Sequence, residues 1–188
     1  MSDLDAQLRE RLAPVGDWAP TRLRRAAVLC PLIRRDGADH LLLGLRPLDS
    51  ATHPGQIAFP GGKVEDDERP VETALRECEE EVGMPPGHVT PLGELPPRES
   101  TSRFFVHCVV GRVAPFELRL SPREVDRVIY GPRDELRDPG RWRVRPPPGA
   151  APGGAAARSP QFRHGGDLVW GLTGSFVRDL VGRLGGGF

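Results

Sequence analysis

The chain has 188 residues and a mass of 20.6 kDa, the size of one ordinary domain with its own core. Its 26 basic and 26 acidic residues give a formal net charge of zero, so no chain-wide field favours nucleic acid or an anionic membrane as a partner. With 23 glycines and 21 prolines the composition stays short of low complexity, and we expect one folded domain over residues 1–188 with long loops.

The first predicted element is a helix in the N-terminal segment, residues 1–20. Leu4, Leu8 and Leu12 recur at intervals of four behind Ser2, a residue type that caps helices, which indicates a short amphipathic helix. The segment carries acidic residues where a secretory signal would carry a basic region and an apolar core. No stretch of the chain approaches the roughly 18 apolar residues that span a bilayer.

Short apolar runs with turns between them follow, and such runs are typical of strands. Residues 26–30 and 41–43 are two of these runs, and the Asp-Gly pair at 36–37 supplies a hairpin turn. A polar loop over residues 46–56 leads to a brief strand at 57–59, which ends at a Pro-Gly-Gly turn.

The best-defined helix is predicted over residues 70–82. Its apolar residues recur at helical spacing: Val71, Leu75, Cys78 and Val82. Pro70 suits the first turn, and Gly83 lies just beyond the last.

The rest of the chain is predicted as strands over 89–95, 104–113 and 125–130, a helical turn over 132–136 and a terminal helix over 170–184. Residues 146–160 are almost entirely proline, glycine and alanine, which predicts a surface loop. Strands and helices are mixed without regular alternation. We therefore expect an α/β (α+β) fold, a mixed β-sheet with helices packed on its faces.

Three cysteines, Cys30, Cys78 and Cys108, lie far apart among apolar residues. This pattern indicates buried free thiols in a reducing compartment, and we expect a cytoplasmic protein.

The helix over 70–82 places Glu77, Glu80 and Glu81 on one face, where like charges repel. Arg76 can neutralise only part of this charge, so one or more hard divalent cations are the natural further partner. The glycines of the preceding turn bring bare backbone close to that face and could add a carbonyl ligand. Taken alone, the glutamates are better explained as a solvated helix face.

The flanking residues decide between these two interpretations. The segment fits the pattern G-x5-E-x7-R-E-U-x-E-E-x-G-U, in which U is apolar, at every fixed position: Gly62, Glu68, Arg76, Glu77, Cys78, Glu80, Glu81, Gly83 and Met84. A chance match is on the order of one in 10^9 per start position. The pattern resembles the signature of the Nudix hydrolase family.

This resemblance implies an α/β/α sandwich that hydrolyses a nucleoside diphosphate linked to another group and binds Mg²⁺ or Mn²⁺. By position, Glu77, Glu80 and Glu81 would bind the metal with help from the Gly61 carbonyl, and Glu68 and Arg76 would orient them.

One carboxylate would also accept the proton of the attacking water. Glu77 is the first candidate for this base, and Glu99 and Glu124 are candidates from outside the signature.

Upstream residues are similar to the extra motif of the coenzyme A pyrophosphatase branch, L-L-T-x-R-(S/A)-x3-R-x3-G-x3-F-P-G-G. Arg46, Gly55 and Phe59 keep its spacing and are the candidate substrate-binding residues. Gly44 and Pro47 depart from the motif, and Ala51 stands where a second arginine belongs. The resemblance thus implies cleavage of coenzyme A to 3′,5′-ADP and 4′-phosphopantetheine, with ADP-ribose or another nucleoside diphosphate derivative as the alternative substrate.

Two further questions stay open at this level. A non-catalytic ligand-binding domain is the third reading, although such domains usually lose signature glutamates that are all present here. The oligomeric state, a homodimer included, is also open.

Several other residues have plain structural explanations beside functional ones. His53 and His107 are expected to be structural, and Arg98 and Arg103 are either phosphate contacts or solvated charges. The tryptophans are expected to pack in the core or at its edge: Trp18, Trp142 and Trp170.

Overall fold

The computed structural model describes residues 2–150 and 158–185 and contains two sheets and four α-helices within them. The large sheet is formed by β1 (Arg24–Arg35), β2 (Ala38–Leu45), β3 (Ile57–Ala58), β4 (Gly61–Lys63), β5 (Val89–Glu99), β6 (Phe104–Val113) and β7 (Arg127–Pro132). The helices are α1 (Asp3–Arg11), α2 (Pro70–Val82), α3 (Arg133–Leu136) and α4 (Gly171–Arg183), with short 3-10 turns at Pro86–His88 and Pro139–Arg141. A small sheet is formed by β8 (Trp142–Arg145), β9 (Ser159–His164) and β10 (Asp167–Val169).

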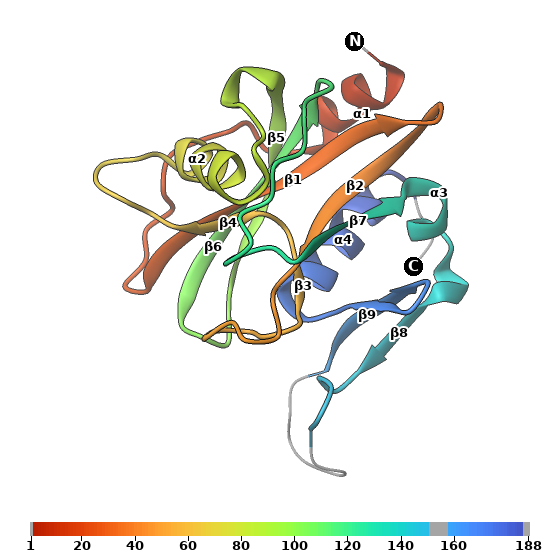
Figure 1. The fold of residues 1–188 in the computed structure, drawn as a ribbon. Helices are drawn as coiled ribbons and strands as arrows, with labels where there is room; N and C mark the ends of the chain where they lie inside the picture. Colours follow the sequence, from red (N-terminus) through yellow and green to blue (C-terminus); the bar gives the residue numbers. More distant parts are fainter. Residues whose placement is uncertain (1, 151–157, 186–188) are drawn as a thin grey trace.

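The large sheet is mixed, as expected. Its strand order is β3-β2-β1-β6-β5, with β4 also paired to β1 and β7 to β2. Strands β1 and β6 run parallel over ten residue pairs, and the other pairings in this sheet are antiparallel. Helices lie on both faces of the sheet (Figure 1), which confirms the predicted α/β class with a mixed sheet.

Each face of the large sheet buries its own apolar cluster. Under α2, Ala74, Cys78 and Val82 are fully buried against Leu29, Val109 and other strand residues. On the opposite face, leucines of α1 and the Phe176 and Leu180 side chains of α4 pack on the other set of strand residues. Because side chains of a strand alternate between faces, one set of strands serves both cores.

Helix α2 spans the predicted residues, Pro70 to Val82. Gly83 ends it in the left-handed region at φ 71°, and the Gly83 N–H donates to the Glu79 carbonyl. The buried stripe differs at one position, because Leu75 is half-buried while its neighbour Ala74 is fully buried. The helix therefore packs close to the sheet through small residues.

The hairpin of β1 and β2 turns at the predicted Asp-Gly pair, where Asp36 and Gly37 both have positive φ (48° and 78°). Strand β6 also matches its prediction, and β5 continues four residues beyond it to Glu99. Its last part includes two prolines at a register shift, which an edge strand tolerates.

Several predicted boundaries were wrong. The strand predicted at 57–59 ends at Ala58, and both glycines of the predicted turn after it belong to β4. Helix α1 ends at Arg11 and does not fill residues 1–20; the Leu12 backbone is already extended, and the chain then follows the edge of β5. Strand β7 begins two residues later than predicted, because Val125 is held in a turn by a backbone hydrogen bond to Ser121. In the loop predicted at 146–160, Ser159 and Pro160 belong to β9, and residues 151–157 lie outside the described residues.

The small sheet was not predicted. Its strands have three to six residues each, and their apolar residues are too few to form the long apolar runs that mark the strands of the large sheet. It extends from the end of the molecule that carries α3 and α4 (Figure 1). The Arg127 guanidinium of β7 ties it to the large sheet through both carboxylate oxygens of Asp167 in β10.

All three cysteines are free and buried, as predicted. No helix in the described part of the chain is long and apolar enough to cross a bilayer.

Candidate active site

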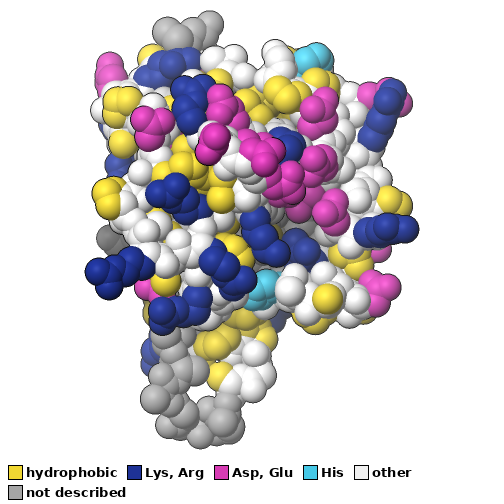
Figure 2. All heavy atoms as spheres, turned by 90° about the vertical axis from the view of Figure 1, so that its left-hand side faces the viewer, with side chains coloured by type: hydrophobic (Ala, Val, Ile, Leu, Met, Phe, Trp, Pro, Cys, Tyr) yellow, Lys and Arg dark blue, Asp and Glu magenta, His cyan; other side chains and the backbone are white. Residues whose placement is uncertain are grey.

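The three signature glutamates extend from one side of α2 and differ in depth. The Glu81 side chain is 7% exposed, Glu77 is 14% exposed and Glu80 is 53% exposed. On the face that carries α2, acidic side chains gather in one patch with arginine and lysine side chains beside it (Figure 2). The exposure of the carboxylates thus decreases from Glu80, which is at the surface, through Glu77 to Glu81, which is buried.

Arg76 joins the acidic residues of the site. Its Nη1 donates to Glu77 Oε1 at 3.2 Å and to Glu80 Oε2 at 3.1 Å, and its Nη2 donates to the Lys63 carbonyl at 2.9 Å. Its Nε donates to Glu68 Oε1 at 2.7 Å. This guanidinium therefore fixes two candidate ligands to the loop that precedes their helix.

Glu68 is held by more than Arg76. Its Oε2 accepts hydrogen bonds from Thr73 Oγ1 at 2.9 Å and from the Glu65 backbone N–H at 3.2 Å. The Arg76 hydrogen bond, followed by those of Glu65 and Thr73, lowers the pKa of Glu68 below its usual value. Glu68 is therefore a fixed anion that orients Arg76.

Glu81 has a different environment. Burial raises its pKa to about 8, and the neighbouring charges of Glu77 and Glu124 add to this rise. The Gly61 N–H at 3.2 Å and Arg46 Nη1 at 4.0 Å oppose it only in part. Burial also raises the pKa of Glu77. A carboxyl in such a place ionises most readily when a cation is bound beside it.

The segment 60–62, which we call the glycine turn although its two glycines belong to β4, fits closely against α2. A side chain at Gly62 would overlap the Glu77 carboxylate, and one at Gly61, whose φ is 151°, would overlap the β1 backbone at Ala27 and Val28. The Pro60 carbonyl also accepts from the Leu29 N–H. Bare backbone is thus required for the carboxylates to reach the turn.

Two of the predicted substrate-binding residues, Arg46 and Gly55, lie in the loop between β2 and β3, and the third, Phe59, follows β3. A backbone hydrogen bond from the Arg46 N–H to the Gln56 carbonyl closes the loop, and Gly55 has a φ of 66°. Arg46 Nε is buried without a hydrogen-bond partner in the described structure. Phe59 is 3% exposed and packs in the core.

The two outside candidates for the base lie in different places. Glu124 contributes to the raised pKa of both Glu77 and Glu81, so the fold brings its charge toward the site. Glu99 ends β5 opposite Phe105, and it is not among the charges that raise those two pKa values.

Arg98 and Arg103, the two candidate phosphate contacts near Glu99, have different surroundings. Arg98 pairs with Asp179 of α4 at 3.2 Å and lies over the Phe176 ring, and Arg103 turns the β5–β6 hairpin at φ 64°.

The donor set suits a hard divalent cation. Within the described residues, no three acidic, histidine or cysteine side chains already stand at metal-ligand geometry, and Arg76 bridges Glu77 and Glu80. The chemistry nevertheless fits Mg²⁺ or Mn²⁺, because the carboxylates and backbone oxygens are the ligands these ions prefer. Among the described residues, the positive side chain paired with the buried Glu81 carboxyl is Arg46, at a distance of 4.0 Å.

Two contacts of the site were not predicted from the sequence. Thr73 stands at a variable position of the signature, yet it is fully buried and its hydroxyl donates to Glu68. A polar residue on the buried side of the helix was the sequence signal that could have indicated this contact. Trp18 donates from Nε1 to the Glu68 carbonyl at 2.7 Å, and its backbone acceptor leaves no trace in the sequence.

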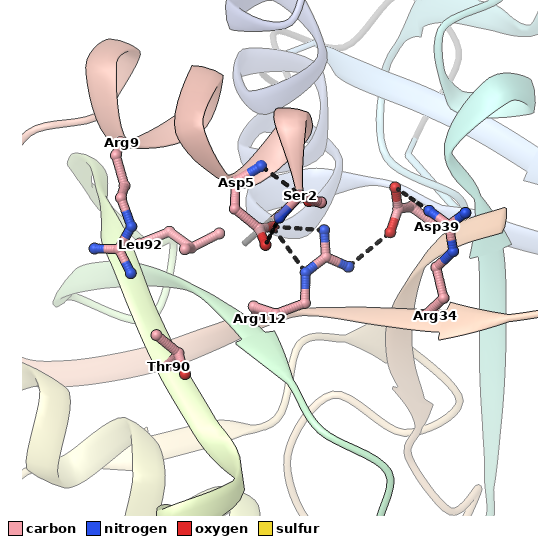
Figure 3. Close-up of a pocket in the computed structure, with 8 residues that line it drawn as sticks. All are labelled: Ser2, Asp5, Arg9, Arg34, Asp39, Thr90, Leu92 and Arg112. Carbon is pink, nitrogen blue, oxygen red and sulfur yellow. Dashed lines mark hydrogen bonds and ion pairs between the residues drawn. The ribbon is translucent and has the colours of Figure 1, made fainter. Parts of the chain in front are cut away.

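A cavity of about 630 Å³ lies at another place, beside α1 (Figure 3). There Arg112 donates to Asp5 of α1 at 2.8 Å and to Asp39 of β2 at 2.6 Å. The carboxylates that line the cavity are thus already paired with arginine. We interpret this network as the attachment of α1 to the sheet.

A mixed sheet between helices, with a glutamate-rich helix seated on a glycine turn, defines the class of the protein as an α/β fold with an acidic candidate active site. The NUDIX domain family model matches residues 23–154, so the chain belongs to the Nudix hydrolase family.

Relatives with similar sequences agree with this assignment. The chain is 37% identical over 176 residues to the uncharacterized Nudix hydrolase NudL of Shigella flexneri serotype 5b, covering 93% of this chain and 90% of the relative. It is 38% identical over 164 residues to NudL of Escherichia coli K12, covering 86% and 83%.

Solved structures share the fold at low sequence identity. The Nudix hydrolase RenU of M. smegmatis matches with a TM-score of 0.52 and 22% identity, over 61% of this chain and 74% of that one. The NUDIX domain of Shewanella oneidensis NrtR, complexed with ADP ribose, matches with a TM-score of 0.50 and 16% identity, over 72% and 86%.

Proposed function

We propose that this protein is a Mg²⁺- or Mn²⁺-dependent pyrophosphohydrolase that cleaves coenzyme A or its derivatives to 3′,5′-ADP and a 4′-phosphopantetheine. The observation that carries the choice of substrate is Arg46. It keeps its place in the extra motif, its Nε is buried without a hydrogen-bond partner among the described residues, and its Nη1 lies 4.0 Å from Glu81 Oε1. A guanidinium so placed would donate a hydrogen bond to a phosphate oxygen of the substrate.

The proposed division of roles follows the geometry of the site. Glu77, Glu80 and Glu81 would bind the ion, with the Gly61 carbonyl assisting. A bound ion supplies charge neutralisation of the pyrophosphate and acidification of the attacking water. Glu68 and Arg76 would hold Glu77 and Glu80 in place through the contacts described above.

Other residues would bind the substrate and accept the proton of the attacking water. Gly55 would shape the loop that carries Arg46, and Phe59, directly after β3, would anchor the segment that follows this loop in the core. One P–O bond of the pyrophosphate breaks as water adds to phosphorus, and a carboxylate takes the proton. Glu77 is our first candidate for this base; Glu124 is the next, because its charge acts on Glu77 and Glu81, and Glu99 is the third.

We further propose that residues 1–188 work as one domain in the cytoplasm, acting on a small molecule. Clusters on both faces of one sheet support the first point, and three buried free thiols support the second.

Incubation of the pure protein with coenzyme A or ADP-ribose under Mg²⁺ or Mn²⁺, followed by mass spectrometry of the products, tests the proposal. We expect 3′,5′-ADP and 4′-phosphopantetheine from coenzyme A. Arg46→Ala should lower kcat/KM for coenzyme A by about 10- to 100-fold through loss of a charged hydrogen bond, and Arg145→Ala, on the exposed β8, should not.

The main alternative is a Nudix pyrophosphatase for ADP-ribose or another nucleoside diphosphate derivative. Ala51, which stands where the motif has a second arginine, favours it. Turnover of ADP-ribose with coenzyme A left intact would establish that alternative. Absence of any turnover together with tight nucleotide binding would instead support a non-catalytic domain.

A further inference from the structure

A strap of chain, residues 13–19, lies across the edge of the large sheet beside the candidate active site. Ala13 and Glu94 of β5 exchange two backbone hydrogen bonds of 3.2 and 2.8 Å, and the Gly16 N–H donates to Glu94 Oε1 at 3.4 Å. Near its other end, the Ala19 N–H donates to Nε2 of His107 at 3.3 Å. The strap is therefore fixed to two strands, and it lies outside the residues matched by the family model.

His107 and Glu94 form a rigid base under the strap. His107 is 3% exposed and Glu94 is 7% exposed, and Nδ1 of the imidazole lies 3.3 Å from Glu94 Oε2. Since Nε2 accepts the Ala19 hydrogen bond, Nδ1 carries the proton and donates to Glu94. Both polar groups are thus satisfied by the strap and by each other.

Trp18 extends from this base to the signature loop. Its ring meets the His107 ring edge-on, with centroids 5.1 Å apart and an interplanar angle of 75°. The Arg25 guanidinium lies 5.7 Å from the indole centroid. The indole Nε1 then donates to the Glu68 carbonyl at 2.7 Å, which is a short and well-defined hydrogen bond.

We infer that Trp18 is a positioning residue of the active site, acting through the Glu68 backbone on the carboxylates of α2. Glu68 orients Arg76 through its side chain, and Arg76 reaches Glu77 and Glu80. A loop released from Trp18 would let Glu68 shift and loosen this chain of contacts. The inference rests on the proposed function, because it assigns Trp18 to the same metal-dependent site.

The matched comparison within this chain is Trp142, whose indole Nε1 donates to the Leu136 carbonyl at 2.8 Å in the region of the small sheet. Trp18→Phe and Trp142→Phe each remove one indole N–H from a backbone carbonyl and retain an aromatic ring. If the Trp18 hydrogen bond served stability alone, the two variants would behave alike.

The experiment measures Mn²⁺ affinity by isothermal titration calorimetry, coenzyme A hydrolysis against Mn²⁺ concentration, and Tm. For Trp18→Phe we expect Mn²⁺ binding about 3- to 10-fold weaker, the size of one lost hydrogen bond, with much of the lost rate restored by excess Mn²⁺. The KM for coenzyme A at saturating Mn²⁺ should be unchanged. Trp142→Phe should change Tm without changing Mn²⁺ affinity.

Mn²⁺ affinity in Trp18→Phe equal to that of the wild type would overturn the inference and leave the proposed function standing. Absence of Mn²⁺ binding by the wild-type protein would overturn both. If Trp18→Phe does not fold, the double variant Trp142→Phe/Trp170→Phe leaves Trp18 as the sole tryptophan. A saturable change of its fluorescence with Mg²⁺ is then expected, and an unchanged spectrum would contradict the inference.

Discussion

The three signature glutamates lie on one side of α2, but they differ in exposure and in the groups they contact: Glu77, Glu80 and Glu81. Glu80 is half exposed and paired with Arg76, whereas the buried Glu81 carboxylate accepts from the Gly61 N–H and lies 4.0 Å from an arginine. A charged group at the surface costs little to maintain, and a buried one needs a compensating partner. Substitutions at these residues should therefore separate activity from stability.

Glu80→Gln is expected to lower Mn²⁺-dependent hydrolysis of coenzyme A by at least about 100-fold, because it removes a candidate ligand. Its Tm should change little, since the side chain is largely solvated. Glu79→Gln is the matched control, because Glu79 is the exposed neighbour on the same helix and should keep full activity. Unchanged hydrolysis by Glu80→Gln would contradict the metal-site assignment.

The raised pKa of Glu81 predicts how the stability of the metal-free protein depends on pH. The carboxyl has an ordinary pKa near 4.5 in the unfolded chain and about 8 in the folded protein. Between these values the folded state keeps a proton that the unfolded state has lost, so the free energy of unfolding should fall as pH rises from about 5 to 8.

Denaturant unfolding of the metal-free protein at a series of pH values measures this dependence. Glu81→Gln should flatten the slope over that window, because its side chain does not titrate, and Glu79→Gln should retain it. An equal pH slope in the wild type and in Glu81→Gln would contradict the raised pKa of Glu81 in the folded protein.

At the scale of elements, the site depends on the contact between the β4 turn and α2. Gly62→Ala is expected to abolish Mn²⁺-dependent hydrolysis, because the added methyl group would occupy the position of the Glu77 carboxylate. Gly87→Ala is the control, since a side chain there meets nothing within 4 Å. Circular dichroism and hydrolysis rates compare the two variants, and an active Gly62→Ala protein would rule out the close packing described here.

The same elements show what the sequence could and could not predict. Helix α2 was located to the residue because its apolar spacing, Pro70 and Gly83 all indicate one span. The hairpin turn at residues 36–37 could also be predicted, because the Asp-Gly pair favours the positive φ values that this turn requires. By contrast, the Trp18 indole N–H donates to a backbone carbonyl 50 residues away, and the small sheet pairs three short strands. Both features depend on long-range contacts that no local pattern encodes.

At the scale of the whole molecule, the ion network of Figure 3 joins α1 to the large sheet, where Arg112 of β6 pairs with Leu32 of β1. The Arg112 side chain is 18% exposed. Its Nη2 lies 2.7 Å from Asp5 Oδ1 of α1, and its Nη1 lies 2.6 Å from Asp39 Oδ1 of β2. The glycine turn is attached elsewhere along β1, where Gly61 pairs with Val28. The network should therefore contribute to stability without taking part in the reaction.

Arg112→Met keeps most of the side-chain volume but leaves two nearly buried carboxylates, Asp5 and Asp39, without their shared cation. Loss of one partner of a buried pair costs about 3–5 kcal/mol, which corresponds to a fall in Tm of roughly 10 °C for a chain of this size. Arg119→Met breaks the exposed pair with Glu117 and should change Tm by at most about 2 °C. Differential scanning calorimetry distinguishes these values. Hydrolysis by Arg112→Met below its Tm should remain near the wild-type rate, so a loss of activity in folded protein would show that α1 and the active site are coupled.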